Sequence, residues 1–123
     1  MIIGIGTDIT DVARIESSVN QYGERFLRRI FTETEREYCE RREKTKYRHY
    51  AARFAAKEAF SKAIGTGVTQ GFAFNLIGIC NEPGGKPTVE LFGIMAERWS
   101  DCRINVSLSH TDDLAVAVVT IER

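Results

Sequence analysis

The segment spanning residues 47–64 places the strongest constraint on the fold, because it predicts one long helix with an unusual face. Small residues recur along it at helical spacing, at Ala52, Ala56, Ala59 and Ala63. A row of small side chains lets another backbone approach closely. Gly65 and Gly67 follow, and glycine readily adopts the left-handed conformation that ends a helix. We therefore expect the other elements to pack on this helix.

The same helix carries an acid and a base, Glu58 and Lys62, which lie four residues apart and so share one face. Their neighbours are mostly alanine and phenylalanine, so that face is not expected to be freely solvated. An ion pair between the two side chains explains the arrangement, and so does a metal ion or a phosphate-bearing ligand. The two residues alone leave these alternatives open.

The rest of the chain divides into a helical part and a part rich in strands. Before the long helix we expect a short buried strand at residues 2–6 that stops near Asp8. Helices are expected at about 11–20, 26–31 and 33–42, the last opened by a capping-box pattern from Thr32 to Glu35. After the long helix we expect strands at 76–80, 88–92, 104–109 and 114–121, the last two as a hairpin, and a short helix at 94–99.

This order of elements predicts an α+β fold in which antiparallel strands pack on a long central helix. A chain of 123 residues has the length of one domain, so we expect a single domain spanning residues 1–123.

The net charge is zero, but the charges are unevenly spread along the chain. Residues 1–62 carry 13 Lys and Arg against 10 Asp and Glu, whereas residues 63–123 carry 4 against 7. The basic residues gather at 25–29 and at 41–53. Solvated helix faces explain such clusters, and a surface for an acidic protein partner is the alternative. The chain lacks a strongly basic balance and an RNA-binding strand motif, which argues against nucleic acid as a partner.

Neither a membrane span nor a disulfide framework is expected. No apolar run reaches the roughly 18–20 residues that cross a bilayer. The cysteines, Cys39, Cys80 and Cys102, are odd in number and widely spaced, which fits neither paired disulfides nor a zinc site. This cysteine usage is typical of a reducing cytoplasm.

Asp8 lies where the apolar start of the chain gives way to a predicted helix. The run Gly4-Ile5-Gly6-Thr7-Asp8-Ile9 lacks the third glycine of a dinucleotide fingerprint, which argues against such a site. A helix-capping aspartate is one interpretation of Asp8, although Asp11 could fill that role too. Together with Glu58 it suggests magnesium, which is commonly held by carboxylates, water and substrate phosphates. Lys62 could then meet a phosphate as a point charge.

His110 closes an alternating apolar row at Ile104, Val106 and Leu108, so we expect it at the inward-facing end of a strand. An ordinary hydrogen-bonded histidine is one interpretation. A histidine that binds phosphate or handles a proton is the alternative.

Several motifs occur in order and with compatible spacing over essentially the whole chain. They are Gly4-Ile5-Gly6-Thr7-Asp8-Ile9 with Arg14-Ile15-Glu16, Arg53-Phe54-Ala55-Ala56-Lys57-Glu58-Ala59, Lys62-Ala63 with Gly65-Thr66-Gly67, Gly85-Lys86-Pro87, and Ser107-Leu108-Ser109-His110-Thr111. Together they resemble the holo-[acyl-carrier-protein] synthases, the short type of 4'-phosphopantetheinyl transferase.

The resemblance implies an enzyme of fatty acid biosynthesis with the 4'-phosphopantetheinyl transferase-like fold. Such an enzyme moves 4'-phosphopantetheine from coenzyme A to a serine hydroxyl of apo-acyl carrier protein and releases adenosine 3',5'-bisphosphate. It implies a Mg²⁺ cofactor held by Asp8 and Glu58, with Lys62 on a phosphate. It also implies a homotrimer with sites between subunits.

The resemblance further assigns binding residues. The implied contacts to coenzyme A are Arg53, Lys62, Gly85, Lys86, Pro87 and His110. The implied surface for the carrier protein consists of Arg14 and the basic helix after it, with Arg25 and Arg28.

The chemistry requires a base, because the serine proton must leave as the hydroxyl attacks the β-phosphate. Glu58, directly or through a metal-bound water, is the favoured base, and His110 is the second candidate. Asp8 and Lys62 complete the expected catalytic set. A different class of function, a non-catalytic module that binds acidic protein partners through its arginine helices, is the alternative.

Overall fold

The structure, a computed structural model, describes residues 1–69 and 72–123. In chain order its elements are β1 (Ile2–Asp11), α1 (Val12–Tyr22), α2 (Glu24–Ile30), α3 (Glu33–Glu40), the 3₁₀ turn η1 (Glu43–Thr45), α4 (Lys46–Ala63), the 3₁₀ turn η2 (Phe74–Leu76), β2 (Ile77–Asn81), β3 (Pro87–Leu91), α5 (Gly93–Trp99), β4 (Arg103–His110) and β5 (Leu114–Glu122).

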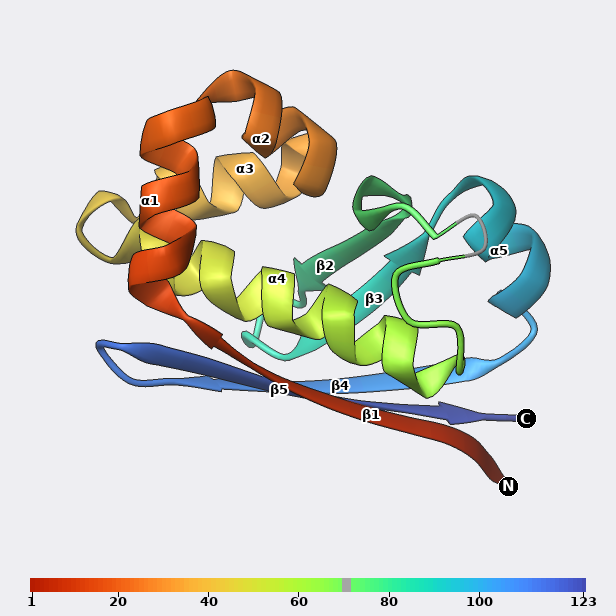
Figure 1. The fold of residues 1–123 in the computed structure, drawn as a ribbon. Coiled ribbons are helices and arrows are strands. Elements are labelled where there is room, and N and C mark those ends of the chain that lie inside the picture. Colours follow the sequence, from red (N-terminus) through yellow and green to blue (C-terminus); the bar gives the residue numbers. More distant parts are fainter. Residues whose placement is uncertain (70–71) are drawn as a thin grey trace.

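Two antiparallel sheets flank the long helix α4 (Figure 1). The larger sheet has the strand order β1-β5-β4, and the smaller one pairs β2 with β3. Helix α4 packs against β1 and β5, while α1 and α3 pack on α4. This arrangement confirms the predicted α+β fold with antiparallel strands on a long central helix.

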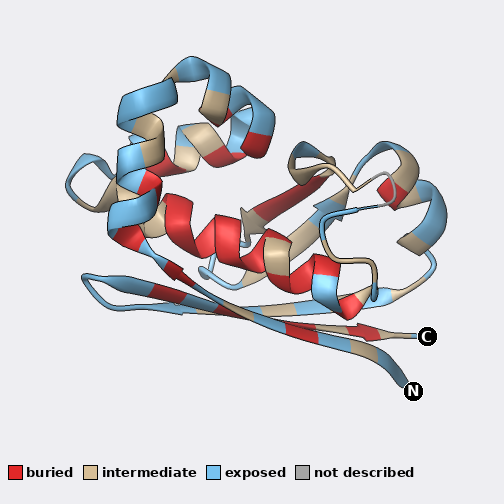
Figure 2. Cartoon of the chain, in the orientation of Figure 1, coloured by how far each residue is buried: buried red, intermediate tan, exposed pale blue. Residues whose placement is uncertain are grey.

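Helix α4 is buried along most of its length (Figure 2). The core divides along it. One cluster joins its first half to the helices α1–α3, with Ile15, Phe31, Tyr50 and Phe54 among its members. The other joins its second half to both sheets, with Phe60, Ile77, Ile79 and Val119 among its members.

The backbone of strand β1 packs directly against the row of alanines on α4. A Cβ atom added to Gly6 would overlap the carbonyl oxygen of Ala59, and one added to Gly4 would overlap that of Ala63. Only glycine fits at either position, because the obstacle is backbone and cannot move aside. The predicted close approach of a second backbone is thus confirmed, and it fixes the residues just after Gly6 against the helix.

The predicted helices and strands are present, with shifts at their ends. The helix expected to run to about residue 42 ends at Glu40, and α1 continues to Tyr22 before Gly23, whose φ is 57°. The hairpin at the end of the chain is confirmed by the antiparallel pairing of β4 with β5.

The expectation for the first strand was wrong in two respects. Strand β1 continues to Asp11 instead of stopping near Asp8, because it pairs with β5 as far as Leu114. It is also not buried on both faces, since Ile5 and Ile9 are 67% and 61% exposed. Ile5 and Ile9 therefore give the sheet an apolar outer face that nothing covers in the described part of the single chain.

The capping box at the start of α3 is confirmed. The backbone N–H of Thr32 donates to Glu35 Oε1 over 2.8 Å, and the N–H of Glu35 donates to Thr32 Oγ1 over 3.2 Å. Both groups would otherwise be unpaired donors at a helix start.

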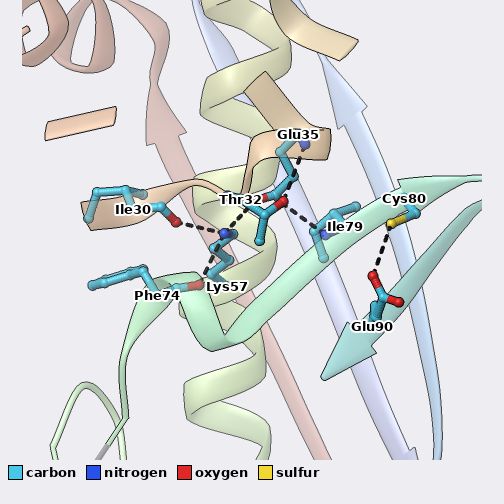
Figure 3. A network of polar contacts seen from close by, with 8 residues as sticks. All are labelled: Ile30, Thr32, Glu35, Lys57, Phe74, Ile79, Cys80 and Glu90. Carbon is cyan, nitrogen blue, oxygen red and sulfur yellow. Dashed lines mark hydrogen bonds and ion pairs between the residues drawn. The ribbon is translucent and has the colours of Figure 1, made fainter. Parts of the chain in front are cut away.

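Glu35 also belongs to a buried ion pair with Lys57 that joins distant segments (Figure 3). Lys57 Nζ donates to Glu35 Oε1 over 2.6 Å and to the carbonyl oxygens of Ile30 and Phe74 over 2.7 and 3.0 Å. Glu35 Oε2 accepts from the N–H of Ile79 over 2.9 Å. Burial lowers the pKa of Lys57, while the charge of Glu35 opposes this effect. The pair therefore ties the ends of α2 and α3 to α4, η2 and β2.

Among residues 1–69 and 72–123, no helix combines the length and the apolar character that a membrane crossing requires.

Candidate active site

Asp8 and Lys62 meet at the junction of β1 and α4. Lys62 Nζ lies 3.1 Å from Asp8 Oδ1 and donates to the carbonyl oxygen of Thr7 over 3.0 Å. Asp8 Oδ2 accepts from Thr10 Oγ1 over 2.9 Å. This contact depends on Gly6, since the strand must lie directly on the helix for Asp8 to reach a lysine 54 residues later.

Glu58 lies one turn before Lys62 and is half-buried. Burial raises the pKa of Glu58, and the nearby negative charge of Asp8 raises it further, whereas Lys62 and Arg14 lower it. The two carboxylates are therefore close enough to repel each other. We call Asp8, Glu58 and Lys62 the carboxylate site.

The structure changes two of the interpretations based on single residues. Lys62 forms its ion pair with Asp8, so the interpretation of Glu58 and Lys62 as a simple ion pair was wrong. Asp8 lies within β1, so it does not cap a helix; the N-cap of α1 is Asp11, whose side chain makes no capping hydrogen bond in the described structure.

The donor set of the carboxylate site fits Mg²⁺. Asp8 and Glu58 repel each other, and a hard cation between the two carboxylates would relieve that repulsion. Magnesium commonly takes only one or two protein carboxylates as ligands. Within residues 1–69 and 72–123, no cluster of three or more His, Cys, Asp or Glu residues forms a fuller metal cage. The remaining ligands would come from water and phosphate oxygens.

A second group of polar residues surrounds Arg53, whose side chain is 2% exposed. The Arg53 guanidinium lies 4.1 Å from the centre of the Tyr38 ring, and Nη2 donates to Asn81 Oδ1 over 2.6 Å. Asn81 Nδ2 donates to the carbonyl oxygen of Gly85 over 2.9 Å. These contacts connect the predicted residues Arg53 and Gly85, and with them the turn at Lys86. We call Tyr38, Arg53, Asn81 and the turn at 82–86 the arginine site.

His110 ends strand β4 beside this group. Its ring lies edge-on to His49, with 5.5 Å between ring centres, and His49 lies 5.5 Å from Tyr38 in the same manner. Burial, together with the positive charges of Arg53 and His110, lowers the pKa of His49 to about 4. The row Ile104, Val106 and Leu108 is partly buried as expected, but His110 itself is exposed.

The carboxylate site and the arginine site are separate in one chain. Asp8 lies on β1 and His110 on β4, which are the two edge strands of the sheet with β5 between them. Arg53 and Glu58 are five residues apart, or about 140° around the helix axis, so they leave α4 on different faces. A ligand that touches both sites would need them to be brought together.

The predicted partner-binding arginines all lie on the helical side of the molecule. Arg14 is exposed on α1, and its positive charge lowers the pKa of Glu58. Arg25 and Arg28 are exposed on α2. With Glu24, Arg29 and Asn75 they line a surface hollow of about 510 Å³.

Four residues that matter here were not singled out from the sequence. Asn81 and Tyr38 hold Arg53, His49 contacts His110, and Lys57 forms the buried pair. For Asn81, its place immediately before the glycine- and proline-rich turn was the available signal.

Comparisons with known proteins agree on one family. A family model described as the 4'-phosphopantetheinyl transferase superfamily matches residues 4–119. Holo-[acyl-carrier-protein] synthases from Rhizobium meliloti and a Bradyrhizobium species are 49% and 47% identical to this chain. These matches cover 99% and 98% of the chain and 92% and 94% of the relatives.

Solved structures show the same similarity. The holo-[acyl-carrier-protein] synthase from Neisseria meningitidis is 36% identical with a TM-score of 0.90, and the match covers 100% of both chains. The Helicobacter pylori synthase, solved in complex with coenzyme A, is 33% identical with a TM-score of 0.84, covering 96% of this chain and 99% of that one.

Proposed function

Because this chain belongs to the 4'-phosphopantetheinyl transferase superfamily, we propose that it transfers 4'-phosphopantetheine from coenzyme A to a serine hydroxyl of apo-acyl carrier protein. The other product is adenosine 3',5'-bisphosphate, and the reaction supports fatty acid biosynthesis. The pairing of Asp8 with Lys62 at the β1–α4 junction, with Glu58 near enough for the charge of Asp8 to raise its pKa, is the observation that carries the proposal. We assign the activity to one domain spanning residues 1–123.

The reaction forms a bond between the serine oxygen and the β-phosphorus and breaks the bond from that phosphorus to the bridging oxygen. Negative charge grows on the phosphoryl oxygens and on the leaving phosphate. Lys62, half-exposed and already positioned by two oxygen acceptors, can place its ammonium on a phosphoryl oxygen. Bound Mg²⁺, held by Asp8 and Glu58, would supply further stabilisation of that charge.

The serine proton needs an acceptor near the attacking oxygen. Glu58 is the proposed base, since its carboxylate lies at the same junction and its half-buried setting favours taking up a proton. His110 is the second candidate, although its place beside the arginine site favours a contact with phosphate.

The arginine site is the proposed binding surface for the other end of coenzyme A. Arg53, Gly85, Lys86, Pro87 and His110 would contact it, as in the resemblance described above. A buried guanidinium beside an exposed glycine turn and a lysine is suited to an anion.

We further propose a homotrimer in which the carboxylate site of one subunit faces the arginine site of the next. Two observations support it: the sites lie apart in one chain, and the outer face of the sheet carries exposed apolar residues, with Ile5, Ile9 and Val116 among them. Sedimentation would then give three times the chain mass of 13.9 kDa. A monomer with full activity would contradict the shared site.

The proposed docking surface for the carrier protein is formed by Arg14, Arg25 and Arg28. Exposed arginines are suited to binding an acidic helix. Arg14 lies near enough to Glu58 for its charge to lower the pKa of that carboxylate, so the surface borders the carboxylate site. The cytoplasm is the proposed location, in line with the free thiols of Cys39, Cys80 and Cys102.

Mass spectrometry tests the function directly. Apo-acyl carrier protein incubated with the chain, coenzyme A and Mg²⁺ should gain the mass of one 4'-phosphopantetheine group. No gain with a carrier protein that a known synthase modifies would refute the proposal. The alternative of a non-catalytic module is not favoured, because the similar proteins described above are synthases.

A further inference from the structure

The side-chain amide of Asn81 is used at both ends, so its orientation is unambiguous. Arg53 can only donate and the carbonyl oxygen of Gly85 can only accept. The amide oxygen must therefore face Arg53, at 2.6 Å, and the amide nitrogen must face Gly85, at 2.9 Å. Exchanging the two atoms would break both hydrogen bonds.

The bond to Asn81 is the one side-chain hydrogen bond of Arg53 in the described part of the chain. The Cζ atom of Arg53 lies 4.1 Å from the centre of the Tyr38 ring, and its Nε atom is buried without a hydrogen-bond partner among the described residues. Packing around this buried side chain and the ring restrain where the guanidinium can go, but neither is directional. The bond to Asn81 therefore supplies the directional restraint on the guanidinium.

The guanidinium faces space into which a ligand group could fit. A cavity of about 170 Å³ is lined by Tyr38, Arg41, Arg53 and Asn81, and Glu37 lines it as well. Its two arginines outnumber its one acid, so the charge of the lining favours an anion.

The turn beside Asn81 does not need its side chain in order to form. The N–H of Glu82 donates to the carbonyl oxygen of Lys86 over 2.9 Å, and the N–H of Gly85 donates to that of Glu82 over 2.7 Å. Gly85 has a φ of 97°, which suits glycine. Loss of the Asn81 amide should thus leave the hairpin folded.

We propose that Asn81 is a positioning residue for coenzyme A: it holds the Arg53 guanidinium in register with the turn at residues 82–86, so that both meet the ligand together. The proposal rests on the proposed function, in which Arg53 and the turn contact coenzyme A. Asn81 itself acts through Arg53 and need not touch the ligand.

The first measurement separates binding from turnover. Asn81→Ala should raise the KM for coenzyme A and the calorimetric Kd for adenosine 3',5'-bisphosphate by about tenfold, as expected for loss of a hydrogen bond to a charged group. The kcat, the KM for the carrier protein and the melting temperature should stay close to those of the parent. Asn20→Ala, which removes an exposed side-chain amide on α1 that is not part of the arginine site, should leave the Kd unchanged.

A double-mutant cycle then asks whether Asn81 acts through Arg53. Arg53→Met retains most of the buried side-chain volume and removes the guanidinium. In that background, Asn81→Ala should change the Kd by less than about twofold. An equal effect in both backgrounds, an unchanged Kd in the parent background, or a general loss of stability and of carrier use would each overturn the proposal.

The parent chain distinguishes this proposal from the proposed function. If the parent neither binds adenosine 3',5'-bisphosphate nor transfers the group, the proposed function fails and the role of Asn81 fails with it. If the parent is active and the Asn81 variants match it, only the role of Asn81 is rejected.

Discussion

At the scale of single residues, the carboxylate site concentrates two acids and one lysine at a strand–helix junction. Asp8 and Glu58 differ in their surroundings, because Lys62 and Thr10 occupy both oxygens of Asp8 while Glu58 lies half-buried with a raised pKa. This difference suits two tasks, one carboxylate fixed as a ligand and the other able to take a proton as well.

Removing either carboxylate should abolish transfer without unfolding the chain. Asp8→Ala and Glu58→Ala should each lower kcat/KM by about 100-fold or more, since the charge on the phosphoryl oxygens loses its stabilisation. The mass-spectrometric assay at saturating Mg²⁺ measures this, with the melting temperature as a check on the fold. Asp11→Ala, an exposed acid at the end of the same strand, is the control and should remain active. Turnover close to that of the parent in either variant would contradict the assignment.

His49 should make the free energy of unfolding depend on pH in the acid range. Its pKa of about 4 in the folded chain lies below the ordinary 6.5, so between these values the unfolded chain binds a proton there and the folded chain does not. The free energy of unfolding therefore falls as the pH falls through this window. His49→Phe should reduce that loss by on the order of 1 kcal/mol, since solvent screens a half-exposed ring. Urea unfolding at both ends of the window measures it, and identical slopes for variant and parent would exclude this origin.

At the scale of elements, α4 is the common support for the helices α1–α3 and for both sheets. It contacts strand backbone through alanine, sheet and helix cores through aromatic residues, and the ends of α2 and η2 through Lys57.

The buried Lys57–Glu35 pair should be costly to break on one side. Lys57→Met leaves Glu35 charged and buried, and it should lower the free energy of unfolding by about 3–5 kcal/mol. Lys46→Met removes an exposed ion pair with Glu40 and should cost only about 0–1 kcal/mol. Chemical unfolding of both variants tests the contrast; equal costs would mean that burial of the first pair does not matter.

The contact of β1 with α4 should tolerate no side chain at Gly6. Gly6→Ala forces the strand away from Ala59 and should cost about 2–3 kcal/mol, with loss of transfer because Asp8 moves with the strand. Gly84→Ala is the control for stability, since nothing lies within 4 Å of its added Cβ. Thermal unfolding compares the two variants and the transfer assay checks Gly6→Ala; a stable, active Gly6→Ala protein would show that the strand can shift without harm.

At the scale of the whole molecule, charge is divided between a basic helical side and the rest. The exposed arginines of α1 and α2 lie on the side where the carrier protein is proposed to dock.

Arg14→Ala should weaken use of the carrier protein more than use of coenzyme A. The KM for the carrier should rise by about fivefold, because exposed charges steer an acidic partner, while the KM for coenzyme A should change little. Added salt should raise the carrier KM of the parent, since charges are screened beyond about 8–10 Å. Arg98→Ala, an exposed arginine on α5, is the matched control. Equal carrier KM values for Arg14→Ala and the parent, or no effect of salt, would favour an apolar docking surface.

The parts of this structure that could be predicted are those set by residues close together in sequence. Alanine content predicted the helix α4 and Gly65 predicted its end, while the capping box joins Thr32 to Glu35, three residues later. Such features depend on residues a few positions apart. They were predicted from the sequence and the structure confirms them.

Contacts between distant residues were not predictable in this way. Lys62 meets Asp8 across 54 positions, and Lys57 meets Glu35 across 22. An exposed apolar strand face, such as that of Ile5, cannot be told from a buried one by composition, because both satisfy the same pattern. The residue types alone suggested that Asp8 and Glu58 share a magnesium ion, and the family resemblance implied the same; their catalytic roles remain predictions.

The buried ammonium of Lys57 has a consequence for substrate choice. It fastens the end of α2, and with it the arginines that would receive the carrier protein, to the same helix that holds Glu58 and Lys62. The proposed docking surface and the proposed reacting groups are therefore attached to one helix, which sets the spacing between them. We expect such an enzyme to select its serine by reach, modifying a hydroxyl that stands at that spacing from the docked helix, whatever residues lie between them.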